Sequence, residues 1–338
     1  MTKAKIAING FGRIGRIFFR QTFNNKYLDI VAINDLSDLE NLAYLLKYDT
    51  VYGVFKGDVK TKKDKLIVNG KEIVFTKIKE PKNLPWKKLK VDIVVEATGV
   101  FSEFTKSKAH IIAGAKRVVI TSPAKDADGT EGKTVLMGVN QGELKSVVLT
   151  SNASCTTNAV SPVIQILSEK LGIEKAILST VHGYTASQNI IDAPHKDMRR
   201  GRAGAENIIP TSTGAARAVA RALPAMEGKF DGLAIRVPVV AGSVADITFI
   251  SKKKTSVEEV NKILSESAKQ PKWKNILRVS EEPIVSSDIV GDPYGAIVDL
   301  EFTRVVDGNL VKVLSWYDNE YGYTATLVKH VINAAALV

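Results

Sequence analysis

The chain has 338 residues, long enough for about two domains of ordinary size, and its formal net charge is +11. Hydrophobic residues make up 45% of it and charged residues 25%, a balance that excludes an intrinsically disordered protein. No apolar run approaches the roughly 18 residues of a membrane helix, and the basic N-terminal stretch reaches a glycine before a signal-peptide core forms. The single cysteine excludes a disulfide framework, so we expect a cytoplasmic protein.

The excess positive charge raises the alternative of a nucleic-acid partner. Two groups of lysines carry much of it: Lys60, Lys62, Lys63 and Lys65, and then Lys82, Lys87, Lys88 and Lys90. No pattern of base-stacking aromatic residues accompanies them, and they fall in a polar strand-and-loop region. We therefore interpret them as a solvated face and do not expect nucleic-acid binding.

The first half of the chain alternates short apolar runs with amphipathic segments. The apolar runs predict strands at residues 5–9, 28–34, 91–96, 117–121, 135–139 and 147–151, and the amphipathic segments predict helices at residues 12 to about 24 and 102–114. Strands that alternate with helices are typical of βαβ units. We expect an N-terminal doubly wound (Rossmann) domain with a parallel sheet, in a protein of the α/β class.

After residue 151 the pattern changes to longer strands with fewer helices between them. It predicts strands at residues 176–182, 233–240, 244–251, 296–302 and 310–316, and helices at 154–171, 215–223, 257–270 and 323–336. This order favours an α+β domain with a mixed or antiparallel sheet. Residues 183–210 form a long irregular segment rich in Arg, Gly and Pro, and an irregular segment of that length indicates a functional loop.

The sequence from Gly10 through Gly12 to Gly15 has the spacing G-x-G-x-x-G, which by itself is a weak signal. An apolar strand precedes it, a helix pattern follows it, and Asp35 ends the next strand about 20 residues later. Such glycines let a dinucleotide pyrophosphate approach the free N–H groups of a helix N-terminus. Asp35 would accept hydrogen bonds from the ribose hydroxyls and disfavour a 2′-phosphate, which favours NAD over NADP. Its alternative role is to cap the helix that follows Leu36.

Cys155 lies between an expected strand and an expected helix, in the sequence SNASCTTN. A thiol at a helix N-terminus is near unpaired N–H groups and the positive end of the helix dipole, and both effects favour the nucleophilic thiolate. The same N–H groups could stabilise an oxyanion. A lone cysteine is more often a small buried hydrophobic residue, but here the flanking side chains are polar, which favours a nucleophile.

A thiolate nucleophile needs a base within reach. His110 and His330 fall on helix-like stretches with aliphatic neighbours, which is typical of packing or surface residues. His182 ends an apolar strand and is followed by Gly183, as expected for a side chain at the rim of a sheet. His182 is therefore the leading candidate, and His195, in the irregular segment, is the second.

Basic residues and a helix N-terminus predict two anion sites. Arg199, Arg200 and Arg202 form a cationic stretch in the irregular segment, and residues 211–214 (TSTG) precede an expected helix. Arg236 falls within an apolar strand, where its charge needs a partner such as a phosphate or a structural carboxylate.

These motifs occur together, in order, along almost the whole chain, and the sequence resembles phosphorylating glyceraldehyde-3-phosphate dehydrogenase. The matching stretches are residues 8–16 (INGFGRIGR), 33–36 (INDL), 96–99 (EATG), 151–158 (SNASCTTN), 194–202 (PHKDMRRGR), 207–216 (NIIPTSTGAA) and 315–323 (SWYDNEYGY). The resemblance implies oxidation of D-glyceraldehyde 3-phosphate to 1,3-bisphosphoglycerate with reduction of NAD. Cys155 would form the thiohemiacetal and thioester, and His182 would act as acid and base.

The resemblance also assigns ligand contacts. It implies cofactor contacts from Gly10, Gly12, Arg13, Ile14, Gly15, Asp35, Lys79, Thr121 and Asn319, the last holding the nicotinamide amide. It implies phosphate contacts from Ser154, Thr156, Thr213 and Gly214 at one site and from Thr185, Arg200 and Arg236 at the other. No metal is expected.

The resemblance further implies a division into an NAD-binding domain, residues 1–153, and a catalytic domain, residues 154–318, with the helix of residues 319–338 packing back on the first. It implies a homotetramer in which residues 183–210 line a neighbour's cofactor pocket. The closest alternative function is erythrose-4-phosphate dehydrogenase, which shares the fold and the Cys/His pair. A less favoured alternative is a non-catalytic dinucleotide- or RNA-binding protein.

Overall fold

The computed structural model describes residues 3–338, so Met1 and Thr2, the start of the expected first domain and of the basic N-terminal stretch, lie outside the described residues. By its internal contacts the chain divides into two compact units. The first contains the described residues through Val135, Gln141–Ala153 and Leu327–Val338, and the second contains Leu136–Asn140 and Ser154–Thr326. No helix in the described part of the chain is both long and apolar enough to cross a membrane.

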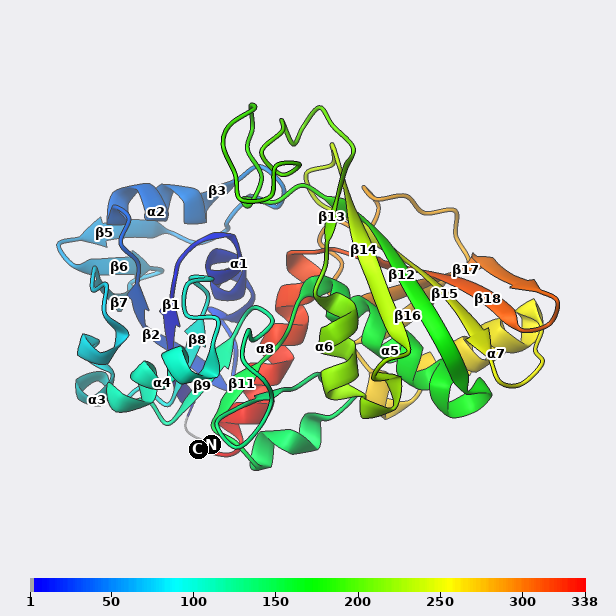
Figure 1. Ribbon diagram of the computed structural model, residues 1–338. Coiled ribbons are helices and arrows are strands. Elements are labelled where there is room, and N and C mark those ends of the chain that lie inside the picture. The colour runs from blue at the N-terminus through cyan, green and yellow to red at the C-terminus, as the bar shows by residue number, and fades with distance from the viewer. Residues whose placement is uncertain (1–2) are drawn as a thin grey trace. The chain divides into compact units, whose positions relative to one another are not determined.

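The first unit is built on a nine-stranded sheet with the strand order β10-β11-β9-β8-β1-β2-β7-β6-β5 (Figure 1). Its strands are β1 (Ala4–Asn9), β2 (Leu28–Asn34), β5 (Val59–Lys62), β6 (Lys65–Val68), β7 (Lys71–Thr76), β8 (Ile93–Glu96), β9 (Arg117–Ile120), β10 (Lys133–Thr134) and β11 (Leu149–Ser151). The strands from β10 to β7 pair in parallel, and β6 and β5 extend the sheet in antiparallel fashion. This confirms the predicted Rossmann-type parallel sheet.

The helices of the first unit connect these strands. They are α1 (Arg13–Thr22), α2 (Leu39–Lys47), α3 (Trp86–Leu89) and α4 (Phe104–Ile112), and a small two-stranded sheet of β3 (Tyr48–Asp49) and β4 (Gly53–Val54) follows α2. Ile6, Ile8 and Val94 of the central strands are fully buried, because both faces of the parallel part of the sheet are covered. The switch from β1 to the neighbouring β2 and β8 places the ends of three parallel strands around the glycine turn.

The second unit contains a seven-stranded mixed sheet with the order β13-β14-β12-β15-β18-β17-β16. Its strands are β12 (Ile173–Gly183), β13 (Ile209–Ser212), β14 (Phe230–Val237), β15 (Ser243–Ser251), β16 (Leu277–Ser280), β17 (Ala296–Val306) and β18 (Leu310–Tyr317). Helices α5 (Cys155–Leu171), α6 (Ala215–Ala222) and α7 (Val257–Ala268) pack on one face of this sheet (Figure 1). Helix α8 (Tyr321–Ala335) closes the chain.

The structure corrects the expected strand at residues 135–139. Val135, Leu136 and Met137 are buried, which accounts for the apolar run, but the backbone forms turns closed by bonds from Val139 and Asn140 to the carbonyl of Leu136. Burial without a partner strand imitates the pattern of a central strand. Helix α2, which the sequence raised only through the alternative role of Asp35, is capped by Asp38, which accepts from the N–H groups of Glu40 and Asn41.

A buried histidine of α8 anchors a loop of the first unit. The His330 ring lies with Nδ1 3.1 Å from Oδ1 of Asn152 and Nε2 2.9 Å from Oγ1 of Thr150. Oδ1 of Asn152 can only accept, so Nδ1 carries the proton and Nε2 accepts from the threonine hydroxyl of a neutral imidazole. Burial, with a smaller contribution from the Arg117 charge, lowers the pKa of His330 to about 3.

This shift predicts a loss of stability in acid. The unfolded chain binds a proton at His330 below its ordinary pKa of 6.5, whereas the folded chain does not until about pH 3, so the free energy of unfolding decreases as the pH falls from 6.5 toward 3. His330→Gln is expected to lower the urea midpoint at pH 7 but to flatten its decrease between pH 6.5 and 4. An unchanged slope in this variant would contradict a neutral buried His330.

Candidate active site

The glycine turn of the first unit leaves β1 and enters α1 without a side-chain cap. Gly10 has φ of +92°, and a Cβ atom there would lie 2.6 Å from the backbone N of Thr98. A Cβ atom at Gly15 would lie 2.2 Å from the carbonyl oxygen of Gly10, so only glycine lets α1 pack this close to the turn. At Gly12, by contrast, no atom lies within 4 Å of the Cβ position. The turn is thus closely packed at Gly10 and Gly15 and open at Gly12.

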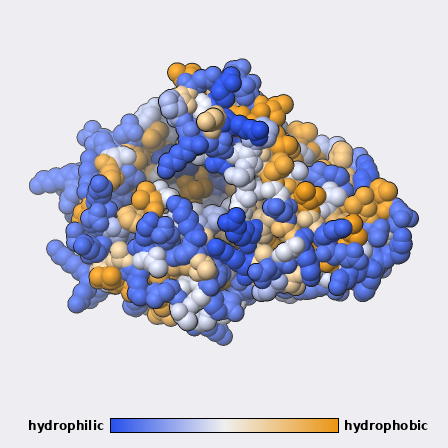
Figure 2. Space-filling view, in the orientation of Figure 1, coloured by the Kyte–Doolittle hydropathy of each residue, from blue (hydrophilic) through white to orange (hydrophobic). Residues whose placement is uncertain are grey.

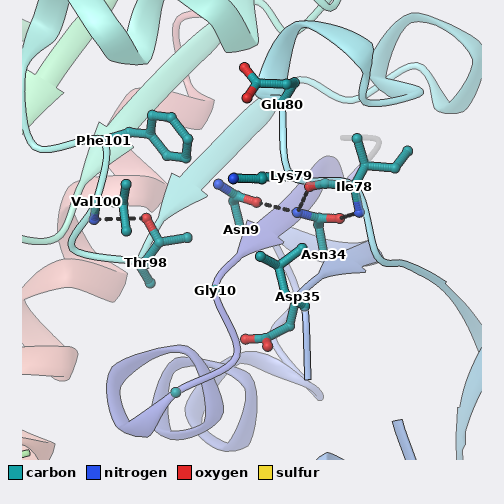
Figure 3. A pocket seen from close by; sticks show the side chains of 13 residues that line it. Asn9, Gly10, Asn34, Asp35, Ile78, Lys79, Glu80, Thr98, Val100 and Phe101 are labelled. Carbon is teal, nitrogen blue, oxygen red and sulfur yellow. Dashed lines mark hydrogen bonds between the residues drawn. The ribbon is translucent and has the colours of Figure 1, made fainter. Parts of the chain in front are cut away.

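A cavity of about 500 Å³ adjoins this turn within the first unit (Figure 3). It is lined by Asn9, Gly10, Gly12, Asn34, Asp35, Leu36, Ile78, Lys79, Glu80, Ala97, Thr98, Val100 and Phe101. Of the cofactor residues that the resemblance implied in this unit, Gly10, Gly12, Asp35 and Lys79 line the cavity, whereas Arg13, Ile14, Gly15 and Thr121 do not. Arg13 begins α1 and forms an ion pair of 2.6 Å with the nearly buried Asp49.

Asp35 is held at the end of β2 by two backbone donors. Its carboxylate accepts from the N–H of Phe11 at 2.7 Å and from the N–H of Ser37 at 2.9 Å. The alternative role of Asp35 as a helix cap is wrong, because Asp38 caps α2. The carboxylate therefore ties the glycine turn to β2 and keeps its charge beside the cavity, where a ribose hydroxyl could donate to it.

Beneath the cavity lies a buried network that sequence reasoning did not find. Asn9 Nδ2 donates to Oε2 of Glu96 at 2.5 Å, and Nε2 of His110 lies 2.9 Å from the same oxygen. The indole N–H of Trp86 donates to Nδ1 of His110 at 3.1 Å, so Nδ1 is unprotonated and Nε2 carries the proton toward the carboxylate. The other oxygen of Glu96 accepts from the backbone N–H of Thr98 at 2.8 Å. The network fixes two residues that line the cavity.

The second unit brings Cys155 and His182 together. Cys155 is the first residue of α5, whose N-cap Ser154 accepts from the N–H of Thr157. The backbone enters the helix through Ala153, a non-glycine residue with φ of +53°. His182 is buried near the end of β12, and its Nε2 lies 3.3 Å from Sγ of the partly exposed Cys155. The structure thus joins the predicted nucleophile and its leading candidate base.

Arg236 completes this cluster from β14, which pairs in parallel with β12 and places Arg236 opposite His182. Nδ1 of His182 lies 2.6 Å from the carbonyl oxygen of Gly183 and 2.6 Å from Nη1 of Arg236. A protonated Nδ1 donates to the carbonyl and leaves the lone pair of Nε2 facing the sulfur, whereas an unprotonated Nδ1 accepts from Arg236. Either arrangement is that of a neutral imidazole.

Burial and charge set the protonation of the pair. Burial, with smaller contributions from the charges of Arg236 and Arg200, lowers the pKa of His182 to about 3. Burial also raises the pKa of the Cys155 thiol, while Arg236 and the backbone N–H of Thr156 act in the opposite direction. The N–H groups at the start of the helix thus favour the thiolate, but burial outweighs them, so the thiol needs a proton acceptor such as Nε2.

Tyr317 lies against this pair, although the sequence singled it out only as part of a matching stretch. Its hydroxyl oxygen is 2.8 Å from Oγ1 of Thr156 and 2.7 Å from Oγ1 of Thr180, and its ring meets the His182 ring edge-on. Burial raises the pKa of Tyr317 well above its ordinary value, so the phenol is neutral. The hydroxyl of Thr156, an expected phosphate contact, is thus bonded to a buried neutral phenol.

The other expected anion residues belong to other segments of the second unit, although the Arg200 charge acts on His182 and Arg236. Arg200 donates to Oγ1 of Thr211 at 2.8 Å and lies 3.5 Å from a carboxylate oxygen of Asp197. Thr185 pairs with Ser187, while Thr213 and Gly214 precede α6, where the N–H of Ala215 donates to Oγ1 of Thr213. Among the hydrogen bonds within residues 3–338, none links these side chains to Cys155 or His182.

The second candidate base, His195, forms its hydrogen bonds within the irregular segment and not with Cys155. His195 is exposed, and its Nδ1 accepts from the backbone N–H of Asp197 at 2.9 Å within the irregular segment. The remaining histidines, His110 and His330, are both fully buried, in agreement with a packing role. Geometry therefore selects His182 among the four histidines.

Fold and site together define a protein with a Rossmann-type nucleotide-binding unit and a second unit that carries a cysteine–histidine pair. The sequence matches two family models: residues 4–104 match "Glyceraldehyde 3-phosphate dehydrogenase, NAD binding domain", and residues 154–319 match "Glyceraldehyde 3-phosphate dehydrogenase, C-terminal domain". The chain belongs to the glyceraldehyde-3-phosphate dehydrogenase family.

Several bacterial relatives carry the name glyceraldehyde-3-phosphate dehydrogenase. The protein of Thermotoga maritima is 51% identical over 328 residues, which cover 96% of this chain and 97% of the relative. Those of Borreliella burgdorferi and Geobacillus stearothermophilus are each 48% identical, over 96% of this chain and 97% and 96% of the relative, respectively. The similarity therefore spans both units.

The glycine turn predicts opposite effects of two similar substitutions. Gly15→Ala should destabilise the protein by about 1–3 kcal/mol, because its methyl group collides with the backbone of Gly10. Gly12→Ala should leave thermal stability nearly unchanged but weaken NAD binding about tenfold, because its methyl group enters the cavity. Calorimetry of unfolding and of NAD binding would test the pair. Equal losses of thermal stability in Gly12→Ala and Gly15→Ala would contradict the close packing of Gly15 against Gly10.

The charge of Arg236 predicts the pH dependence of the thiol. Removing this cation by Arg236→Ala destabilises the thiolate, so the pKa of Cys155 should rise further and alkylation by iodoacetamide at neutral pH should slow. The rate of alkylation, measured from pH 5 to 10, would show the midpoint shifted upward. Arg236→Lys, which keeps a cation, should raise the pKa of Cys155 less than Arg236→Ala does. Arg304→Ala, which removes a cation that stacks on Phe302, serves as the control.

Proposed function

We propose that this chain is an NAD-dependent phosphorylating glyceraldehyde-3-phosphate dehydrogenase, which converts D-glyceraldehyde 3-phosphate and inorganic phosphate to 1,3-bisphosphoglycerate. The observation that carries the proposal is the contact of 3.3 Å between Sγ of Cys155 and Nε2 of His182 at the start of a helix. Family membership supports the substrate and the cofactor.

The first step is attack on the aldehyde. As the Cys155 sulfur bonds to the aldehyde carbon, its proton passes to Nε2 of His182, while Nδ1–H donates to the carbonyl oxygen of Gly183. The backbone N–H groups of the first turn of α5 are oriented to stabilise the developing oxyanion. The proton on Nε2 then neutralises this oxygen, and a thiohemiacetal results.

NAD supplies the hydride acceptor when it is bound, so that oxidation of the thiohemiacetal leaves a thioester on Cys155. His182 takes the hydroxyl proton of the thiohemiacetal as the carbonyl re-forms. A phosphate oxygen then attacks the thioester carbon, and the carbon–sulfur bond breaks with its electron pair going to sulfur. The sulfur takes back the proton held by His182, and the acyl phosphate is released. The Arg236 charge beside His182 supports a role in holding an anion next to the reacting carbon.

The first unit fits the cofactor. Open space above Gly12, the N-terminus of α1, and the carboxylate of Asp35 at the cavity provide a place for a pyrophosphate and an acceptor for ribose hydroxyls. We further propose contacts from Arg13, Ile14, Gly15, Lys79, Thr121 and Asn319. Ser154, Thr156, Thr213 and Gly214 are proposed for one phosphate, and Thr185, Arg200 and Arg236 for the other.

We propose a homotetramer in the cytoplasm, with functional domains at residues 1–153 and 154–318 and a C-terminal helix, residues 319–338, that belongs with the first. Apolar side chains on the irregular segment support association, since Ile190, Ile191, Met198 and Ile208 are 72–88% exposed. Figure 2 shows several apolar patches among hydrophilic atoms over this part of the second unit. Large apolar side chains exposed together on one segment are typical of protein interfaces.

The test is an assay of NADH absorbance with glyceraldehyde 3-phosphate, NAD and phosphate. Cys155→Ser should abolish NADH formation while NAD binding persists, and His182→Asn should slow acylation by roughly two to four powers of ten. Ser161→Ala, which removes a buried hydroxyl further along α5, is the control for damage to the helix. Turnover that is indifferent to phosphate, or preference for erythrose 4-phosphate, would contradict the proposal.

A further inference from the structure

The amide of Asn319 is held in one orientation within the second unit. Its Oδ1 accepts from the backbone N–H of Gly242 at 3.1 Å and from the hydroxyl of Ser243 at 3.0 Å. A backbone N–H can only donate, so a flipped amide would oppose its NH₂ group to the N–H of Gly242 and lose that hydrogen bond. Oδ1 of Asn319 therefore accepts hydrogen bonds from the protein itself.

The nitrogen of the same amide is left for a ligand. Asn319 is 6% exposed, and within residues 3–338 the hydrogen bonds of its amide engage Oδ1 and not Nδ2. Nδ2 is not among the buried side-chain atoms of residues 3–338 that lack a partner, so a ligand can reach it. An NH₂ group only donates, and a ligand that meets it must therefore present a hydrogen-bond acceptor, such as a carbonyl oxygen.

Ser243 connects this amide to the strand that carries the base. Its hydroxyl has one proton, which it donates to Asn319, and its lone pair accepts from the backbone N–H of Gly183 at 3.2 Å. Ser243 is 2% exposed and pairs directly with His182 across the antiparallel strands β12 and β15. Gly183 is also the residue whose carbonyl oxygen accepts from His182. The buried hydroxyl of Ser243 thus fixes the position of the Asn319 amide relative to the strand that carries His182.

We propose that Ser243 is a positioning residue, which fixes the Asn319 amide so that Nδ2 donates to the carboxamide oxygen of the nicotinamide. This inference rests on the proposed function, because it takes NAD as the ligand. The side-chain hydrogen bonds of Ser243 within residues 3–338 join it to Asn319 and Gly183, so it acts through Asn319.

The test compares the dissociation constants of NAD and of ADP-ribose, which lacks the nicotinamide. Ser243→Ala leaves Oδ1 with a single donor, so NAD binding should weaken about three- to tenfold, the worth of one hydrogen bond, while ADP-ribose binding stays within about twofold. Asn319→Asp should weaken NAD binding more than Asn319→Ala, because it presents a carboxylate oxygen to a carbonyl oxygen. The matched control is Ser251→Ala, which removes a buried hydroxyl at the other end of β15.

The outcomes separate the two proposals. A wild-type chain that forms no NADH from glyceraldehyde 3-phosphate contradicts the proposed function, whatever Ser243 does. An active wild type with an unchanged ratio of the two dissociation constants in Ser243→Ala contradicts the role of Ser243. Should Ser243→Ala not fold, Ser243→Cys keeps a weaker donor of similar size. A ratio of the NAD to the ADP-ribose dissociation constant above the wild-type value supports the inference, and a wild-type ratio overturns it.

Discussion

The contact between the Cys155 sulfur and Nε2 of His182 is the interaction on which the chemistry of this fold depends. It requires the first residue of α5, Cys155, to lie beside the last residues of β12, which ends just after His182. Helix α5 packs on the sheet that contains β12, so the sulfur and the imidazole are fixed by the core of the second unit and not by a flexible loop. This rigidity is what a catalytic pair requires.

The three buried histidines are alike in that both nitrogens of each ring have a hydrogen-bond partner. In His182, His110 and His330, each ring nitrogen has a defined partner. At His330 these bonds are structural. At His110 the indole of Trp86 directs the proton toward Glu96. At His182 the carbonyl oxygen of Gly183 favours the tautomer that turns the lone pair of Nε2 toward the sulfur, whereas Arg236 favours the other tautomer. Burial is inexpensive for a neutral imidazole with both nitrogens satisfied.

The sequence predicted β2 at its observed bounds and α5 to within its N-cap, because an apolar run and a cap residue are local signals. It failed at residues 135–139, where burial came without strand pairing. The predicted nucleophile and base meet in the structure, since both follow from strand and helix ends. Ser243 was not predictable, because its role depends on the register of β12 and β15, which no local pattern specifies.

The thiol shows why a local motif does not determine ionisation. A helix N-terminus stabilises a nearby charge by about 0.3–1 kcal/mol, and this effect fades within one turn. Burial of an ionisable group shifts its pKa by up to about 3–5 units, a larger effect of opposite sign for a thiolate. Burial therefore outweighs the helix at Cys155, and the Arg236 charge is needed to offset part of it. Burial is the main cause that keeps His182 neutral, and the same charge adds to it. One cation therefore favours the thiolate of Cys155 and the uncharged form of His182.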